Sequence, residues 1–391
     1  MSSFGASWRE VASVFLKIGA MAYGGPAIMG IMQAELQEKR RWVDKERFLE
    51  GLALVNLLPG AGATQLGIFL GYARGGWWGG LLAGLCFVLP ALFIMLALTA
   101  AYAALGSTPF MRGALYGLGP VVLGIYAVAV FRLGKSAITG APQVLIAVAA
   151  ALVTAAGPLG LVTVLALAGG IGILLFASRR QGLAVLAAIA LMVALMHYVG
   201  GTPTLALEAK VGAGDTPAGL FDIGVFFFKV GAFTFGGGLT MIAFVQEQVV
   251  NQFHWLTPRE FVDGLALGQF TPGPILMVAA YVGFKLAGIA GALVAAAAIF
   301  LPSFILMLSL LPIFERVRKI AWMKAAMRGI GPAVIGVLAV SLAQLAPHAA
   351  PDLFAASVFV ATVLILLVWR VGAIKLMLGG ALLGTLRDRL A

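Results

Sequence analysis

Charged side chains are scarce in this sequence. Asp, Glu, Lys and Arg make up 10% of the 391 residues, whereas a soluble domain carries roughly a quarter. Hydrophobic residues account for 62%, which leaves too little polar surface for a water-soluble body of this size. These proportions exclude a cytosolic enzyme and a nucleic-acid-binding protein, and they make the net charge of +11 a matter of membrane topology.

Cysteine and histidine are also rare. The single cysteine, Cys86, lies within an apolar run, so neither a disulfide framework nor a thiolate zinc site can form. The three histidines, His197, His254 and His348, lie near segment ends without the spacing of metal ligands. The sequence therefore predicts no metal site, no cofactor and no enzymatic activity.

Long apolar runs dominate the chain instead. A membrane-spanning helix needs about 20 mostly apolar residues, and on this criterion the chain contains about thirteen segments. They cover residues 11–36, 48–72, 77–104, 113–133, 142–156, 158–177, 182–200, 221–250, 260–285, 287–314, 329–346, 352–369 and 371–386. Because lipid cannot satisfy backbone groups, these segments must be helices. We predict an all-α polytopic membrane protein, and we expect no cleavable leader because the first segment carries Lys17.

The sequence contains an internal repeat at an offset of 212 to 213 residues. The offset pairs Phe15, Lys17, Gly19, Gly24, Gly25, Glu35, Trp42, Pro59, Gly60, Gly71, Pro90 and Pro120 with Phe227, Lys229, Gly231, Gly236, Gly237, Glu247, Trp255, Pro272, Gly273, Gly283, Pro302 and Pro332. We therefore expect a first repeat over 1–181, a connecting transmembrane helix and linker over 182–219, and a second repeat over 220–391.

Basic residues indicate that the two copies have opposite orientations. The loop at 38–47 is rich in Lys and Arg, whereas the equivalent loop of the second copy offers only Arg259. The bias reverses between the third and fourth segments, where the first copy has Arg112 and the second has a basic cluster at 316–328. Equivalent loops therefore lie on opposite sides of the membrane, which makes the copies inverted-topology repeats.

The first two segments of each copy carry helix breakers at their centres. These are Gly24-Gly25-Pro26, Pro59-Gly60, Gly236-Gly237-Gly238 and Pro272-Gly273-Pro274. If such segments enter and return on one side, the basic loops at 38–47 and 316–328 both become cytoplasmic. We expect two broken or re-entrant helical hairpins in each repeat, followed by full transmembrane helices; four kinked spanning helices are the open alternative.

Inverted repeats with discontinuous helices are typical of secondary transporters, whose site lies near the midplane at the repeat interface. A half-helix that starts at a breaker presents backbone N–H groups and a partial positive charge, which favour an oxyanion. Close helix packing is the alternative interpretation of the glycine pairs. The expected substrate-binding residues are Gly24, Gly25, Pro26, Ala27, Pro59, Gly60, Ala61, Thr64, Gln65, Gly236, Gly237, Gly238, Gln269, Thr271, Pro272, Gly273 and Pro274.

Ionisable residues at membrane depth are costly and are candidates for function. Lys17 and Lys229 are matched by the repeat, and in a hairpin Glu35 and Glu247 return to nearly the same depth. We expect these residues, with Asn56, to compensate substrate charge or to couple transport. Structural pairs of Lys17 with Glu35 and of Lys229 with Glu247 are the alternative.

The motifs resemble the chromate ion transporter family in its long, fused two-domain form. The resemblance rests on Lys17-x-Gly19 leading to Tyr23-Gly24-Gly25-Pro26, on Leu58-Pro59-Gly60 followed by Thr64-Gln65, and on Gln269-Phe270-Thr271-Pro272-Gly273-Pro274. It implies export of chromate across the bacterial cytoplasmic membrane, giving chromate resistance, with sulfate as the close analogue. The first copy departs from the family pattern, because Ala61 stands where a second proline is typical.

The expected function is therefore secondary transport of chromate by alternating access. Transport of sulfate or another oxyanion, and an anion channel of the same architecture, are the alternatives. An intramembrane enzyme would need a catalytic cluster that the sequence lacks. The expected partners are a small inorganic oxyanion and the lipid bilayer, without nucleic acid, and a homodimer is left open.

Overall fold

The computed structural model describes residues 4–23, 25–105, 108–157, 159–198, 219–234, 238–313, 321–369 and 371–390. The first copy consists of α1 (Phe4–Met21), α2 (Gly25–Met32), the π-helix η1 (Gln33–Lys39), α3 (Lys45–Leu57), α4 (Gly62–Leu105), α5 (Pro109–Ala137), α6 (Ala141–Ala156) and α7 (Leu161–Phe176). The helix α8 (Arg179–Tyr198) follows and packs against α7. No strand occurs in the described part of the chain, and the protein is all-α.

The second copy repeats this order. It consists of α9 (Leu220–Ala232), α10 (Leu239–Val245), the π-helix η2 (Gln246–Gln252), α11 (Pro258–Phe270), the 3-10 turn η3 (Ile275–Met277), α12 (Val278–Leu310), the turn η4 (Leu311–Ile313), α14 (Ala321–Ala349), α15 (Leu353–Val368) and α16 (Ala373–Leu390). Even local backbone features recur, because Arg41 and the equivalent His254 both have a positive φ.

The broken segments fold back as helical hairpins. Gly51 on α3 lies against the ring of Phe69 on α4, and the equivalent Gly264 on α11 lies against the ring of Tyr281 on α12. A straight helix would hold residues this far apart in sequence about 27 Å from each other. The chain therefore reverses at the two Pro-Gly breakers, as predicted for these segments, and re-entry of the segments from one side of the membrane stays a prediction.

The helices α4 and α12 each contain a second reversal. Gly75 and Gly76 interrupt α4, Ala287 and Gly288 interrupt α12, and both pairs have non-helical backbone angles. On either side of the first interruption, Gly71 lies directly against Gly79. Each helix is therefore two antiparallel helices joined by a tight turn, and the longer second part is the first full transmembrane helix of its copy.

The two copies run in opposite directions. Gly80 and Gly84 of α4 lie against Leu308 and Phe304, respectively, of the equivalent helix α12. Residue numbers therefore increase along α4 in the direction in which they decrease along α12, so the two helices are antiparallel. The equivalent helices α5 and α14 pair in the same antiparallel way, with Gly119 facing Ala349 and Gly134 facing Ile335. An antiparallel pairing of equivalent helices requires a two-fold relation across their axes. The repeats are inverted, as the loop charges predict.

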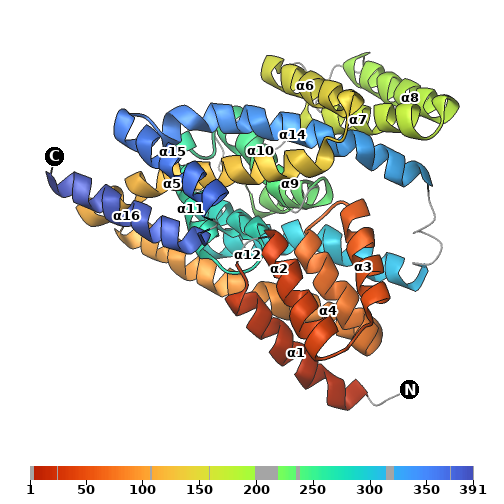
Figure 1. The fold of residues 1–391 in the computed structure, drawn as a ribbon, viewed down its shortest axis with the longest axis horizontal. Coiled ribbons are helices and arrows are strands. Elements are labelled where there is room, and N and C mark those ends of the chain that lie inside the picture. The colour runs from red at the N-terminus through yellow and green to blue at the C-terminus, as the bar shows by residue number, and fades with distance from the viewer. Residues whose placement is uncertain are drawn as a thin grey trace.

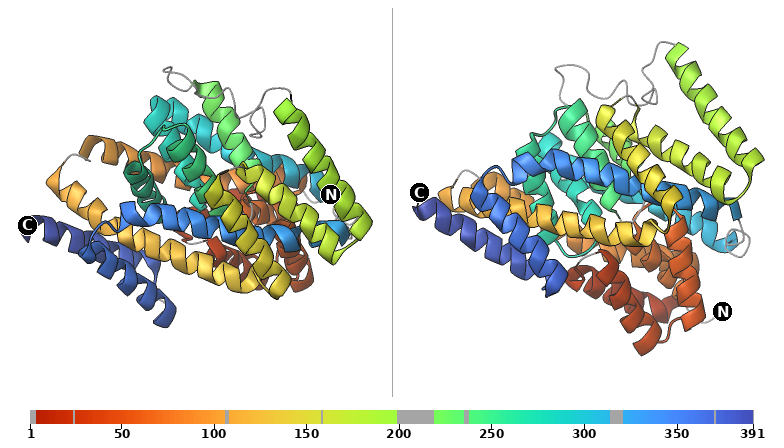
Figure 2. Two further views of the ribbon diagram at one scale, coloured as in Figure 1. Left: turned by 90° about the horizontal axis from the view of Figure 1, so that it is seen from above. Right: turned by 45° about the horizontal axis from the view of Figure 1, so that its top comes forward.

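The long helices exchange partners between the copies. α5 packs against α15 and α16 of the second copy, and α14 packs against α6 and α7 of the first. These helices approach closely because glycines face each other across the contacts and let the backbones meet, as at Gly117 with Gly380 and at Gly172 with Gly329. Figures 1 and 2 show α15 and α16 beside α5 at one end, and α6 and α7 beside α14 at the other.

Four described helical stretches contain a part long and apolar enough to cross a membrane: Gly62–Leu105 and Ile275–Leu310, each with its internal reversal, Pro109–Ala137 and Trp322–Ala349. Shorter apolar helices lie at Ala141–Ala156, Leu161–Phe176 and Leu353–Val368. Their outer faces carry large exposed hydrophobic side chains such as Phe93, Leu145 and Val360. Exposed apolar surface on this scale fits lipid contact, and the chain is a multi-pass membrane protein.

Candidate functional site

The break between α3 and α4 is built by Leu58, Pro59 and Gly60. Leu58 leaves the helical conformation, with φ −97° and ψ 145°, because a residue before proline is biased away from it. Gly60 has φ +126°, a region that side chains rarely tolerate. The Gly60 amide then donates a hydrogen bond of 2.6 Å to the carbonyl of Thr234, which follows α9 of the other copy.

The break between α11 and α12 makes the reciprocal contact. Gly273 has φ +95°, and its amide donates a hydrogen bond of 2.7 Å to the carbonyl of Ala22, which follows α1. Ala22 and Thr234 occupy equivalent positions in the two copies. Each Pro-Gly break is therefore seated on the interrupted helix end of the opposite copy.

Both breaks lie beside the crossing of α4 and α12. A Cβ on Gly273 would lie 3.0 Å from the Cβ of Ala91, and a Cβ on Gly60 would clash with the hydroxyl of Ser303. Ala91 and Ser303 are equivalent, and each follows the proline of its helix, Pro90 or Pro302. The breaks therefore converge at the interface between the copies, which is where the sequence predicts a site.

A compensating difference explains the missing proline of the first copy. The Ala61 amide donates a hydrogen bond of 2.8 Å to the Ser303 hydroxyl. In the second copy Pro274 has no amide hydrogen to donate, and Ala91 has no hydroxyl to accept it. The first copy thus has an amide and an acceptor where the second has neither.

Polar side chains gather at the first-copy break. Thr64 and Gln65, in the first turn of α4, are 0% exposed. The Gln65 Nε2 donates to the Pro59 carbonyl at 2.6 Å, but Thr64 Oγ1 and Gln65 Oε1 have no hydrogen-bond partner among the described residues. Buried polar atoms without partners are uncommon and costly, so these atoms are candidates for ligand contact.

The second-copy break is more apolar. Leu276 and Met277 stand where the first copy has Thr64 and Gln65, and both are buried. The Thr271 hydroxyl is satisfied by the Leu267 carbonyl at 2.9 Å and contacts the Met95 sulfur at 3.4 Å. Gln269, on the last turn of α11, is partly exposed.

The remaining break residues lie at helix starts. Gly25, Pro26 and Ala27 begin α2, and Gly238 caps α10 with φ +98°. Gly24, Gly236 and Gly237 lie outside the described residues.

Comparison with known proteins agrees with this architecture. The chromate transporter family model matches the chain twice, over residues 9–173 and 221–385. The chain belongs to the chromate transporter family. It is 34% identical to the chromate transport protein of Cupriavidus metallidurans, over 96% of this chain and 92% of that protein.

Two further relatives of the chromate transporter family cover most of the chain. The probable chromate transport protein of Synechococcus elongatus is 32% identical over 89% of this chain and 86% of its own length. The chromate transport protein of Pseudomonas aeruginosa is 32% identical over 93% and 88%. No solved structure matches the chain.

The charged residues of the first copy have nearby partners. Glu35 accepts from Arg40 Nε at 2.8 Å and from Lys39 Nζ at 3.3 Å. The structural pair of Glu35 with Lys17, which was the alternative interpretation, does not form among the described residues, and the role of both residues in transport stays a prediction. Neighbours four and five residues away reach the carboxylate along the π-helical turn, while Lys17 is exposed on α1. Asn56 is exposed on α3.

In the second copy Glu247 accepts from Asn251 at 2.8 Å and from Gln252 at 3.3 Å. Lys229 is partly buried on α9, and its pairing with Glu247 stays a prediction.

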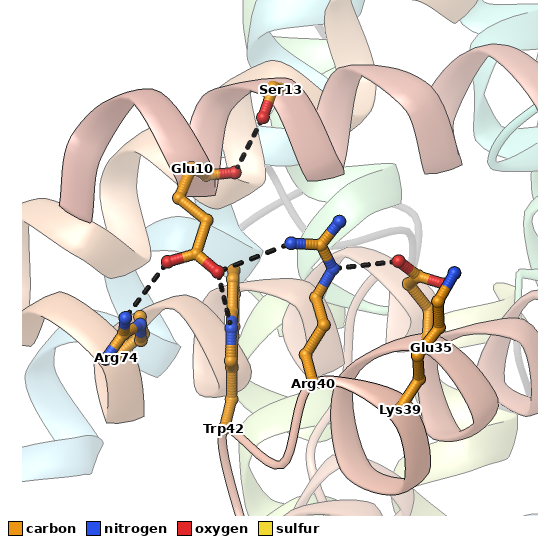
Figure 3. Close-up of polar contacts among 7 residues, drawn as sticks. All are labelled: Glu10, Ser13, Glu35, Lys39, Arg40, Trp42 and Arg74. Carbon is orange, nitrogen blue, oxygen red and sulfur yellow. Dashed lines mark hydrogen bonds and ion pairs between the residues drawn. The ribbon is translucent and has the colours of Figure 1, made fainter.

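An ion-pair network closes the first hairpin of the first copy (Figure 3). The Glu10 carboxylate on α1 accepts from Arg74 at 3.0 Å, from Trp42 at 3.2 Å and from Arg40 at 3.3 Å. The equivalents of Arg40 and Arg74 are Phe253 and Leu286, and there Phe253 packs on Trp255 with ring centroids 4.8 Å apart. Ion pairs hold one copy and aromatic contacts hold the other.

The network predicts an acid-sensitive contribution to stability. Glu10 precedes the first apolar segment, and the hydrogen bond from Arg74 lowers the pKa of its carboxyl, against the opposing effect of burial. A lowered folded-state pKa stabilises the fold above the unfolded-state pKa, and this stabilisation is lost as pH falls through the folded value.

Glu10→Gln should therefore lower the unfolding midpoint in detergent at pH 7 by about 2 °C, because partly exposed ion pairs contribute little. The difference from the wild type should shrink to nothing as the pH falls through the lowered pKa of the folded-state Glu10 carboxyl. Glu38→Gln, which removes an exposed carboxylate of the same hairpin, is the control and should leave the midpoint unchanged. Equal shifts for both variants would contradict the network's role.

Sequence reasoning missed two polar residues near the copy interface. Ser303 accepts the hydrogen bond from the Ala61 amide. The sequence difference that could have revealed it is that a serine follows Pro302, whereas Ala91 follows the equivalent Pro90. Asp263 is a buried carboxylate on α11 with 6% exposure. Its signal was an acidic residue within the apolar segment 260–285.

Proposed function

We propose that this protein exports chromate from the cytoplasm across the bacterial inner membrane, with the oxyanion bound where the broken helices meet. Membership of the chromate transporter family supports the substrate class. The observation that carries the placement is the pair of reciprocal bonds, Gly60 to Thr234 and Gly273 to Ala22, beside two buried polar side chains without full partners.

A dianion needs compensation when it leaves water. The amide groups of the first turn of α4 have no intrahelical acceptor and carry a partial positive charge. The Thr64 hydroxyl is a further donor beside them. Lys17 lies about 7.5 Å along the α1 axis from Ala22, on the same interrupted helix. Thr64 and the α4 turn are the primary contacts of the proposed site.

The positions of the reciprocal bonds support alternating access as the proposed mechanism. Each bond joins one copy to the other, so rocking of the copies breaks it and releases the Gly60 or Gly273 amide. The amide then needs a new acceptor, because an unsatisfied buried donor costs about 1–3 kcal/mol. A chromate oxygen takes the place of the carbonyl in this proposal, and the carbonyl returns when the anion leaves.

Flux of labelled chromate through purified protein in liposomes tests the function. We expect saturable uptake well above that of protein-free liposomes. Uptake that rises linearly with concentration and follows the membrane potential would indicate a channel instead.

Competition and orientation complete this test. Unlabelled sulfate in excess should lower chromate flux only partly; complete competition with faster sulfate flux would identify a sulfate transporter. Everted membrane vesicles should accumulate chromate, and right-side-out vesicles should exclude it. The opposite pattern would contradict export.

A further inference from the structure

Asp263 is a carboxylate withdrawn from solvent on the broken helix α11. The residue is 6% exposed and lies among Phe261, Val262 and Leu265, which are buried. An ionised carboxylate in such surroundings is costly unless it is fully paired, and ionisable residues inside membrane proteins commonly mark ion or proton pathways.

The carboxylate is only partly paired. The Tyr102 hydroxyl donates to Oδ2 at 3.1 Å. The Arg259 Nε lies 3.5 Å from Oδ1, but Oδ1 accepts no hydrogen bond from the described residues. Oδ1 therefore has room for a proton without the loss of an existing hydrogen bond.

The charges around Asp263 are balanced. On α11, Glu260 forms an ion pair of 2.7 Å with Lys285 of α12, and Arg259 compensates Asp263. Two cations therefore face two carboxylates. Protonation of Asp263 changes the net charge of these four residues from zero to +1. The electrostatic energy of the three neighbouring charged groups therefore depends on whether Asp263 is protonated.

Tyrosines complete the surroundings. From α12, Tyr281 donates to the Glu260 carbonyl at 2.9 Å, and its ring meets that of Tyr102 at 5.8 Å. From α5, Tyr116 lies 5.6 Å from the Arg259 guanidinium and donates to Asp352, which precedes α15.

Beyond Tyr116, Arg387 of α16 pairs with Asp352. Among the described residues, the ion pairs of Asp263, Arg259, Glu260 and Lys285 are those with one another, and none reaches α14, η2 or η3, the other elements that contact α11.

The bond from Tyr102 to Asp263 crosses the copy interface. Tyr102 is on α4 of the first copy, whereas Asp263 belongs to the second. The equivalent carboxylate of the first copy, Glu50, has a side chain that is 32% exposed and lies 3.1 Å from Arg47. At this repeat position the carboxylate is therefore buried only in the second copy. Its hydrogen bond from Tyr102 joins the two copies, so rocking of the copies must disturb that bond.

We propose that Asp263 is the proton-binding residue that couples this transporter to the pH gradient. When the copies separate at this contact, Tyr102 releases Oδ2, and the carboxylate takes a proton from water on that side. When the contact re-forms, the proton leaves to water on the other side, so each cycle moves one proton. The inference rests on the proposed function for its substrate.

The test compares two fluxes of labelled chromate through the full-length protein in liposomes. The first is exchange against unlabelled chromate at equal pH on both sides. The second is net flux driven by a pH gradient, with the membrane potential clamped by potassium and valinomycin. Because every variant meets the same chromate solution, differences between variants report the protein alone.

Asp263→Asn should keep exchange within about threefold of the wild type and lose about tenfold or more of the gradient-driven flux, as expected when one of two coupled ligands is removed. Glu50→Gln, which neutralises the equivalent exposed carboxylate, should retain both fluxes. Tyr102→Phe keeps the carboxylate and removes one hydrogen bond, so it should shift the pH dependence of exchange without abolishing it.

Three results with the variants overturn the proposal. They are a gradient response in Asp263→Asn equal to that of the wild type, equal losses in Asp263→Asn and Glu50→Gln, and an unchanged pH dependence in Tyr102→Phe. A wild type that exchanges chromate but ignores the gradient also overturns it while leaving the proposed function intact. A wild type that exchanges no chromate contradicts the proposed function instead.

Discussion

Replacement of Gly273 by alanine is expected to lower chromate flux by about tenfold or more while the protein still inserts and purifies. The φ of +95° is unfavourable for any residue with a Cβ, and such strain costs about 1–3 kcal/mol. The added methyl group would also lie 3.0 Å from the Cβ of Ala91, which is on the other copy. The backbone relieves both problems by moving away from the interface, which weakens the amide bond to Ala22.

Gly288 provides the matched control for this experiment. It also has a positive φ, +61°, and lies in α12, the helix that follows the Gly273 break, but a Cβ there would meet nothing within 4 Å. Gly288→Ala therefore adds backbone strain without touching the copy interface. Flux per folded molecule, normalised by size-exclusion chromatography, should remain near the wild-type value. If both variants lose flux equally, general backbone strain explains the result and the placement of the site is wrong.

The architecture could be predicted because its causes are local in the sequence. An adjacent proline and glycine combine a missing amide hydrogen with access to a positive φ, so Pro59-Gly60 and Pro272-Gly273 marked real breaks, whereas the isolated Pro90 and Pro302 stay inside helices. The repeat offset and the basic loops predicted inversion, and the antiparallel pairing of α5 with α14 confirms it.

Contacts between distant segments could not be predicted in this way. The exchange of partners, in which α5 packs on α16 and α14 on α7, depends on how the two copies dock. A pair of Glu35 with Lys17 was the alternative interpretation because a hairpin brings them to one depth, but Arg40, five residues from Glu35, binds the carboxylate instead.

The sequence indicates that the two Pro-Gly breaks differ, because Ala61 stands where a second proline is typical, but it does not show what replaces the proline. The structure adds the hydrogen bond from Ala61 to Ser303, which only a residue with an amide hydrogen can make. The compensating residue lies 242 positions away, so a single sequence offers no local signal for it.

Thr64→Val is expected to separate transport from stability at this asymmetric site. The Thr64 hydroxyl is fully buried and has no hydrogen-bond partner among the described residues, so its removal should leave the unfolding midpoint unchanged or raised. If the hydroxyl donates to the oxyanion, its loss costs about 1.5–3 kcal/mol of binding. The concentration of chromate at half-maximal flux should then rise by about 10- to 100-fold.

Thr99→Val makes the same chemical change in the same helix, away from the break. Thr99 is 1% exposed, but its hydroxyl donates to the Met95 carbonyl at 2.7 Å and so is already satisfied within α4. This variant should lower the unfolding midpoint slightly and leave the half-maximal concentration unchanged. The two threonines thus give opposite patterns, one affecting transport and the other stability. A Thr64→Val protein that transports chromate with wild-type affinity would place the oxyanion elsewhere, because no other side chain in the first turn of α4 offers a buried hydroxyl.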